Sequence, residues 1–319
     1  MDAAEPRSLA PLSVGARVAA VLGVLTAMLA VLMTLIRPWY LDWGTTVAER
    51  GRALPGDSLT AGPPYETRAI DIQAPAEQVF AWVAQLGQNR AGFYSYTALE
   101  NLVGCEMPDL RQLDPALQAW RPGDKLWMYP PDELDGMGHA SLLHYEPGRA
   151  LVFGTHTPLD PPGAPPSGSW SFVVEPTSAH SARLLTRGSG GSTHTWLGHA
   201  FTRAVFEPLH FAMERRMLEG IKGLAEGRPI SRASDIMQLL AWVATFGLFI
   251  ASAVLVLVGS RPVRRLIAFA GAGVAFQVVT LAQPASALSL ALAIALVWLI
   301  SSAPRRRAAG AGDMLEQTS

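Results

Sequence analysis

Apolar residues in this chain gather in four long runs instead of being spread along it. The runs cover residues 18–36, 236–258, 266–282 and 285–300, and none of them contains Asp, Glu, Lys, Arg or His. A helix of about 20 apolar residues is long enough to cross the hydrocarbon core of a bilayer. The pattern therefore predicts four transmembrane helices, with the third and fourth near the short end of the required length.

The residues between the first and second runs have the mixed polarity of a folded domain outside the membrane. A stretch rich in Gly, Pro and polar residues, 51–64, precedes this domain, and Gly227-Arg228-Pro229 follows it. Such breaks are typical of linkers. The predicted organisation is a tail (1–17), a transmembrane helix (18–36), a linker (37–64), a domain (65–228), three transmembrane helices (236–303) and a tail (304–319).

The composition agrees with a membrane protein, because 50% of the residues are hydrophobic and 16% are charged, against about 25% charged in soluble domains. The net charge of −1 offers no electrostatic basis for binding nucleic acid. The single cysteine, Cys105, excludes an internal disulfide and a metal site built from several cysteines. We expect neither a metal nor a cofactor.

The first apolar run fits either a cleavable signal peptide or a permanent anchor. It is longer than the roughly 7–15 apolar residues of a signal peptide, and it ends in Arg37-Pro38-Trp39-Tyr40 instead of small residues. We therefore interpret it as an uncleaved anchor. Trp39, Tyr40 and Trp43 then suit the membrane interface, where amphipathic rings lie at the depth of the headgroups.

The arginines predict the orientation in the membrane. Four spans place both termini and the loop between the second and third spans on one side, which carries Arg7, Arg17, Arg261, Arg264, Arg265, Arg305, Arg306 and Arg307. The flanks of the central domain carry fewer arginines, so the difference is modest. The positive-inside rule makes the first side cytoplasmic. The expected protein is a multi-pass protein of the plasma membrane with an extracytoplasmic domain.

Within the domain, the pattern predicts a strand, two helices, five strands and a long helix. Residues 67–72 alternate as in a strand, and Pro75 opens a helix that ends near Gly87. The further predicted elements are a helix over 96–103, strands over 125–129, 139–146, 150–155, 169–175 and 182–187, and a helix over 203–226. A Pro-rich tract, 157–169, predicts a long extended loop.

This order is that of the helix-grip fold, an α+β arrangement in which a curved antiparallel sheet surrounds a long C-terminal helix. Residues 67–103 (TRAIDIQAPAEQVFAWVAQLGQNRAGFYSYTALENLV) resemble the start of the SRPBCC superfamily, which includes START, polyketide-cyclase and birch-pollen-allergen proteins. The match continues in RPGD (121–124), EPGRAL (146–151) and EPLHFAMER (207–215). The sequence is especially similar to a membrane-anchored actinobacterial branch of that superfamily.

The resemblance covers roughly residues 65–226 and implies a hydrophobic cavity between the sheet and the long helix. Members of the superfamily bind lipids, transport them, cyclise polyketides or have no known activity. The fold alone therefore does not decide the function. The sequence signatures of serine hydrolases, P-loops, zinc proteases and CxxC proteins are absent.

The long helix carries the strongest candidate for chemistry. Its apolar face is formed by Phe211, Met217, Leu218, Ile221 and Ala225. His210 and Glu214 fall within that face, with Glu207 beside them, and residues four apart on a helix can touch. A buried carboxylate without a partner costs several kcal/mol. Glu214 must therefore be paired, protonated or in contact with a wet cavity.

Three roles remain open for His210 and Glu214. They form a structural hydrogen-bonded pair, or a polar pole that orients the headgroup or carbonyl of a ligand, or a catalytic pair in which Glu214 tunes His210 as a general acid–base. Two ligands on one helix turn also suit a metal, but no convincing third ligand is evident.

A second candidate region, residues 85–101, lies between and within the two short helices, where helix-grip folds border the cavity entrance. Its side chains either contact a ligand there or have structural roles, with Tyr96 packed inward and Glu100 and Asn101 at a helix cap or in water. The predicted ligand contacts of the whole domain are Trp82, Gln85, Tyr94, Tyr96, Asn101, Trp127, Trp170, Phe172, His210, Glu214 and Met217.

The function predicted from these features is the binding of a hydrophobic small molecule, such as a lipid, isoprenoid or polyketide, by a domain held beside the bilayer. The first alternative is a cyclase, dehydratase or hydrolase that uses His210 and Glu214 on such a molecule. The second alternative is a signalling or scaffolding membrane protein without a ligand, in which the cavity would be absent.

Overall fold

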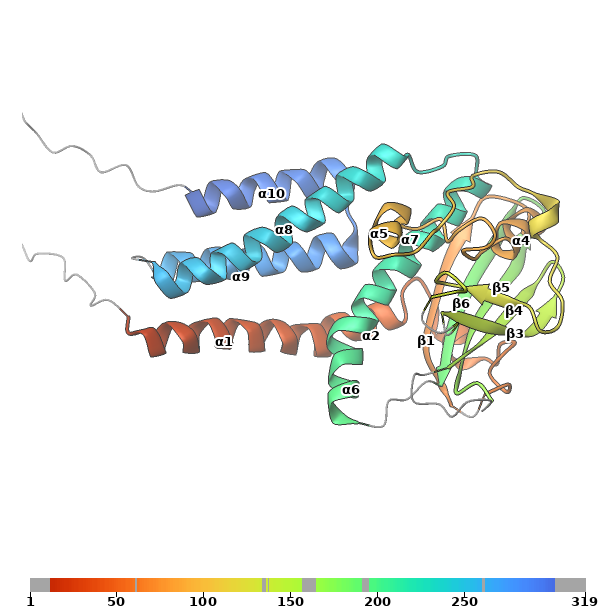
Figure 1. The fold of residues 1–319 in the computed structure, drawn as a ribbon, viewed down its shortest axis with the longest axis horizontal. Coiled ribbons are helices and arrows are strands. Elements are labelled where there is room, and N and C mark those ends of the chain that lie inside the picture. Colours follow the sequence, from red (N-terminus) through yellow and green to blue (C-terminus); the bar gives the residue numbers. More distant parts are fainter. Residues whose placement is uncertain are drawn as a thin grey trace, which may run out of the picture.

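The computed structural model describes residues 12–60, 62–133, 136, 138–156, 165–190, 195–259 and 262–301. A bundle of apolar helices forms one end of the molecule and a sheet-and-helix domain forms the other (Figure 1). The helix α7 (Glu207–Ala225) runs from their junction into the domain. Part of the predicted Pro-rich loop, 157–164, lies outside the described residues.

Among the described residues, four apolar helical segments make up the bundle. They are α1 (Val14–Val31), continued by η1 (Leu32–Ile36) and α2 (Arg37–Leu41); α8 (Arg232–Val258); α9 (Pro262–Gln277), continued by η5 (Val278–Ala282); and α10 (Ser286–Ser301). They run side by side, and the start of α1 and the end of α10 lie far from the sheet (Figure 1). Three stretches are long and apolar enough to cross a membrane, namely Val14–Leu41, Arg232–Val258 and Val263–Ala282.

The prediction of four full spans is wrong for the last run. Within the described residues, α10 has 16 residues and extends about 24 Å at 1.5 Å per residue, short of the roughly 30 Å hydrocarbon core. The run itself, 285–300, has only 16 residues, and α10 follows it to within one residue at each end. Gln283 adopts a left-handed φ of 44°, and Pro284 lacks the amide hydrogen that a helix interior needs, so α10 begins only at Ser286.

The domain is built on one antiparallel sheet in the order β1-β6-β5-β4-β3-β2. Its strands are β1 (Pro64–Ile72), β2 (Lys125–Trp127), β3 (His139–Glu146), β4 (Ala150–Thr155), β5 (Gly168–Ser178) and β6 (Ser181–Gly190). All six strands were predicted, β1 from the alternation of its residues and the other five as strand candidates separated by turn signals. The inner face carries the main apolar core, which includes Phe153, Phe172 and Leu184, each no more than 1% exposed.

Helices cover the inner face of this sheet. The short helices are α4 (Ala76–Ala84) and α5 (Thr97–Leu102), close to their predicted positions. The long helix was predicted as one element over 203–226. In the structure this helix is α7, and α6 (Trp196–Phe201) and the π-helical η4 (Thr202–Phe206) come directly before it. Met217, Leu218 and Ile221 of α7 are each no more than 2% exposed against the core, so the helix is gripped by the sheet as the pattern predicts.

Part of the segment 37–64, expected to be a linker, packs on the outer face of the sheet, where Leu54 joins a buried apolar cluster with Val173 and Leu185. The segment contains α3 (Val47–Gly51). Arg187 on β6 has a side chain 1% exposed and forms an ion pair with Asp57 at 2.7 Å. The same guanidinium donates to the carbonyl oxygen of Glu49 at 2.7 Å. This buried cation holds the segment in place, so the domain is attached to α1 through packed structure.

Ion pairs also fix the domain against the membrane helices. Arg37 at the end of the first span donates to both carboxylate oxygens of Glu207 on α7, at 2.7 and 3.0 Å. Arg216 on α7 is 4% exposed and pairs with Asp235 at the start of α8. Two separate spans are thereby tied to α7, and the domain lies directly on the end of the bundle.

Candidate functional site

A cavity of about 460 Å³ lies at one end of the sheet, between α7, the inner sheet face and the segments on either side of α5. Its apolar wall includes the rings of Phe93 and Trp170 and four methionines, Met107, Met128, Met213 and Met217. Ligand pockets have volumes of about 300–1,000 Å³ and mostly apolar walls. Flexible thioether side chains adapt to ligands of irregular shape.

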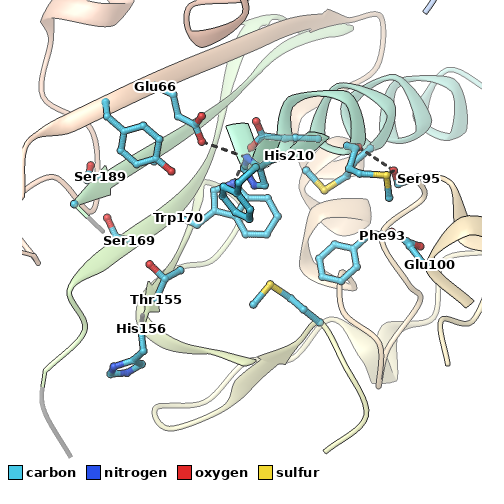
Figure 2. A pocket seen from close by; sticks show the side chains of 18 of the residues that line it. Glu66, Phe93, Ser95, Glu100, Thr155, His156, Ser169, Trp170, Ser189 and His210 are labelled. Atoms are coloured by element: carbon cyan, nitrogen blue, oxygen red, sulfur yellow. Dashed lines mark hydrogen bonds and ion pairs between the residues drawn. The ribbon is translucent and has the colours of Figure 1, made fainter. Parts of the chain in front are cut away.

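One end of the cavity is formed by a buried charged cluster that joins β1 to α7 (Figure 2). Glu66 and Arg68 lie on the inner face of β1, and Arg68 forms ion pairs with Glu66 at 2.6 Å and with Glu214 on α7. Arg68 Nε also donates to the carbonyl oxygen of Tyr40 at 2.9 Å. The second oxygen of Glu214 accepts from Trp170 Nε1 at 2.7 Å. Every charged group of the cluster is therefore hydrogen-bonded.

The two carboxyl groups of this cluster are both buried, but their pKa values shift in opposite directions. The side chains of Glu66, Arg68 and Glu214 are 0–3% exposed. Burial raises the pKa of Glu66 above its ordinary value, and the attraction of Arg68 offsets that only in part. Burial acts on Glu214 in the same direction, but Arg68, His210 and two hydrogen bonds outweigh it and lower the pKa of Glu214. Glu214 is thus the carboxylate of the cluster, and Glu66 is the group that takes up a proton more readily.

His210 is the member of the cluster that remains accessible from the cavity. Its side chain is 26% exposed, and its Nδ1 lies 3.6 Å from Glu66 Oε1. Phe206 stacks on the imidazole at 5.5 Å, and Trp170 meets it edge-on at 5.8 Å. The ring is therefore held in one orientation, with Nδ1 toward Glu66. Nε2 is left as the nitrogen that can bond a molecule in the cavity.

The predicted contact between His210 and Glu214 is replaced by contacts to β1. No hydrogen bond joins these two side chains within the described residues, although ligand atoms of Glu66, His210 and Glu214 lie within 4.8 Å of one another. Such a trio offers three possible metal ligands. The positive charge that a metal would bring is already supplied by Arg68, which pairs with both carboxylates. We therefore do not assign a metal centre here.

Glu100 on α5 forms a second polar point, on the opposite side of the cavity from Glu66 (Figure 2). Its Oε2 is buried and has no hydrogen-bond partner among the described residues. Burial raises the pKa of Glu100 to about 7. A carboxyl group that is largely protonated below neutral pH thus stands in an otherwise apolar wall.

Four of the predicted contact residues line the cavity: Trp170, His210, Glu214 and Met217. The cavity occupies only the end of the sheet where β4 and β6 finish and β5 starts. Most of the predicted aromatic residues lie elsewhere for that reason. Trp82 and Tyr94 pack against each other in the core at 5.7 Å, and Phe172 is fully buried there.

The remaining predicted contacts also do not line this cavity. Trp127 packs on a histidine of β3 at 4.9 Å, and Tyr96 lines a separate cleft near the membrane. Gln85 bonds the backbone of the segment after α5, with Nε2 donating to Gln112 O at 2.9 Å. Asn101 accepts from the backbone N–H of the residue at position 107 at 2.7 Å. Both amides thus have structural partners, as the alternative interpretation of residues 85–101 expects.

Sequence reasoning missed the partners that β1 supplies, although the signal was present. Successive side chains of a strand point to opposite faces. The alternation that places Ile70 and Ile72 on the inner face also places Glu66 and Arg68 there. A charged residue in that register predicts a buried partner, and Glu214 is that partner.

No protein-family model matches the chain, and the comparison with curated proteins finds no match. Several solved structures are similar over about half of it. A protein from Mesorhizobium loti, MLL2253, is 14% identical over 52% of this chain and 100% of its own, with a TM-score of 0.29. A protein from Thermobifida fusca is 17% identical over 50% and 93%, with a TM-score of 0.32. The polyketide-cyclase-like protein Cgl2372 from Corynebacterium glutamicum is 16% identical over 50% and 83%, with a TM-score of 0.23.

These values are too low to assign a family or a function. The resemblance to helix-grip proteins rests instead on the six-stranded antiparallel sheet and the helix it surrounds. Membership of a membrane-anchored actinobacterial branch stays a prediction.

Proposed function

We propose that the domain binds a hydrophobic small molecule that carries one polar, hydrogen-bonding end. The observation that supports this most strongly is the cavity itself. Its volume of about 460 Å³ suits a ligand, and much of its wall is made of aromatic rings and methionines. Burial of apolar area then supplies the affinity, at about 25 cal/mol per Å².

His210 is the proposed contact for the polar end of the ligand. Glu66 and Glu214 form ion pairs with Arg68 inside the protein. Their proposed role is therefore to orient the imidazole of His210, while Arg68 neutralises the charge of the carboxyl groups. His210 Nε2 can accept a hydrogen bond from a hydroxyl or, when the ring is protonated, donate one to a carbonyl. The ligand class is accordingly a lipid, isoprenoid or polyketide with such a group at one end.

A pair of matched substitutions tests the proposal. Met128 lines the cavity and is 37% exposed, whereas Met237 on α8 is 38% exposed and lies outside it. Full-length wild type, Met128→Trp and Met237→Trp are purified from the same membranes, and small molecules are extracted and identified by mass spectrometry. A compound that accompanies wild type and Met237→Trp but is depleted in Met128→Trp supports the proposal. Equal recovery from all three contradicts it.

A second candidate is an enzyme that acts on the bound molecule. The observation in its favour is His210, which lines the cavity and whose Nδ1 lies 3.6 Å from the buried carboxyl group of Glu66. This is the arrangement of a general acid–base with an orienting partner. Glu66, not Glu214, would be that partner, because both oxygens of Glu214 already accept hydrogen bonds from Arg68 and Trp170.

The enzyme and the binding protein differ in the fate of the ligand. In an enzyme, His210→Gln purifies with a chemically different compound from that of wild type, namely the unreacted substrate. In a binding protein, the same variant retains less of the same compound. A scaffold without a ligand, the remaining alternative, gives no cavity-dependent compound at all.

A further inference from the structure

A second hollow of about 340 Å³ lies where the domain meets the membrane helices. We call it the membrane cleft. Its walls come from α5, α7, α8 and η5, so it joins two elements of the domain to two predicted spans. Leu239 on α8 and Val279 on η5 line the side that belongs to the spans.

The surface of the membrane cleft is hydrocarbon. Apart from Glu100, the polar side chains of Trp242 and Gln238 that reach it have partners inside the protein. Trp242 Nε1 donates to Thr280 Oγ1 at 3.0 Å, and Gln238 Nε2 donates to Pro284 O at 3.0 Å. With these donors satisfied, the cleft selects for an apolar chain.

The cleft lies at the level where the bilayer surface is expected. α6 runs across the direction of α1 at the end of α1 nearest the domain (Figure 1). Its apolar side chains Trp196 and Leu197 are 77% and 62% exposed, as in a helix that lies in the membrane interface. Val103 and Leu209, which line the cleft, are 63% and 44% exposed. Exposed apolar side chains at this level are suited to contact with lipid.

The membrane cleft and the ligand cavity share part of their walls, because Glu100 and Met213 line both. The side chain of Met213 lies between the two hollows, and its three rotatable bonds allow it to change conformation. The Met213 carbonyl oxygen accepts from Ser95 Oγ at 2.9 Å, which fixes the backbone, while the same hydroxyl meets the Met213 sulfur only at 3.9 Å, a weak contact that the side chain can give up. Glu100 presents a carboxyl oxygen that lacks a partner among the described residues.

We propose that the membrane cleft is the passage through which the hydrocarbon chain of a bilayer lipid reaches the ligand cavity, with Met213 and Glu100 as the partition that opens. This inference rests on the proposed function, since it requires a cavity that binds an apolar molecule. It adds the source of the ligand, which is the bilayer, and the route.

The test uses palmitic acid that carries a photoactivatable diazirine. Full-length protein in phosphatidylcholine vesicles is mixed with donor vesicles containing this probe and irradiated after increasing delays. Mass spectrometry then assigns the label to cavity residues or to cleft residues. Leu239→Trp fills the cleft, and Leu240→Trp is its control, because Leu240 is adjacent on α8, 55% exposed and outside the cleft.

The proposal predicts label in both places for wild type and Leu240→Trp, with the cleft labelled first. Leu239→Trp should lose the early cavity label and recover it after long incubation, because its cavity is unchanged. Val103→Trp serves as a second block at the exposed rim, should Leu239→Trp fold poorly. Cavity labelling as fast as wild type in both blocked variants overturns the route but leaves the proposed function standing. Absence of cavity label in wild type at every delay overturns both.

Discussion

Replacement of Arg68 by methionine is the most informative single perturbation of the charged cluster. It removes the cation that pairs with two carboxyl groups, Glu66 and Glu214, whose side chains are no more than 3% exposed. It also removes the hydrogen bond to Tyr40 O. Breaking a buried ion pair from one side costs about 3–5 kcal/mol. We expect the upper part of that range, because two groups lose their partner.

The pH dependence distinguishes this loss from simple packing damage. In wild type, Arg68 helps to lower the pKa of Glu214, so Glu214 contributes stability above its ordinary pKa of 4.5 that is lost as the pH falls. Without Arg68, burial raises the pKa of both carboxyl groups, and their protonated forms are favoured in the folded state. The deficit of Arg68→Met relative to wild type should therefore be smaller at about pH 5 than at about pH 8.

The assay is thermal unfolding of the full-length protein in nanodiscs, followed by tryptophan fluorescence. At about 2–4 °C per kcal/mol for a domain of this size, the midpoint should fall by roughly 8–20 °C near neutral pH. Arg149→Met is the control, since Arg149 pairs with Glu146 at the surface with side chains 52% and 40% exposed, and such pairs contribute about 0–1 kcal/mol. Equal effects of the two substitutions, or a deficit of Arg68→Met that does not change with pH, would refute the reasoning.

Three further predictions concern other parts of the molecule. Burial raises the pKa of Glu100 to about 7 from 4.5, so its stabilising contribution is present at low pH and is lost as the pH rises through 7. The unfolding midpoint of Glu100→Gln should therefore depend less on pH than that of wild type. Parallel curves of midpoint against pH for the two proteins would count against this prediction. Arg187→Leu should increase amide hydrogen exchange in residues 47–57, which its guanidinium holds on the sheet, and unchanged exchange there would show that the contact is dispensable. The orientation can be tested in a cysteine-free background with a membrane-impermeant thiol reagent applied to intact cells. The reagent should label Ala179→Cys in the exposed turn after β5 and should not label Ser301→Cys at the end of α10. The reverse pattern would place the domain in the cytoplasm.

Most of the fold was accessible from sequence because each element has a local signal. The first strand follows from period-two alternation, the other five from the turn signals that separate them, and the bundle from long runs without charge. The sequence-based expectations fail where contacts between distant parts of the chain determine the position of a residue. Arg216 has the helical position of a surface residue, yet Asp235 of α8 covers it. The error in the last apolar run is of another kind, because its 16 residues, 285–300, are already too few for a full span of about 20.

The site was only partly predictable, for a related reason. His210 and Glu214 could be recognised as polar residues on an apolar helix face, but their partners come from a strand about 140 residues earlier in the chain. Pairing across that distance depends on how β1 lies beside α7, which sequence patterns do not give. Trp82 and Phe172 are indistinguishable in sequence from cavity-lining rings, because the position of a void is set by where packing fails.

The central claim, that the cavity holds a hydrophobic molecule with a polar end at His210, is tested most directly by an experimental structure of the full-length protein purified from its own membranes. The account predicts continuous density between Phe93 and Trp170 that ends within hydrogen-bonding distance of His210 Nε2. A cavity closed by inward movement of Met213 and Met217, or filled only by separate water molecules, would contradict it.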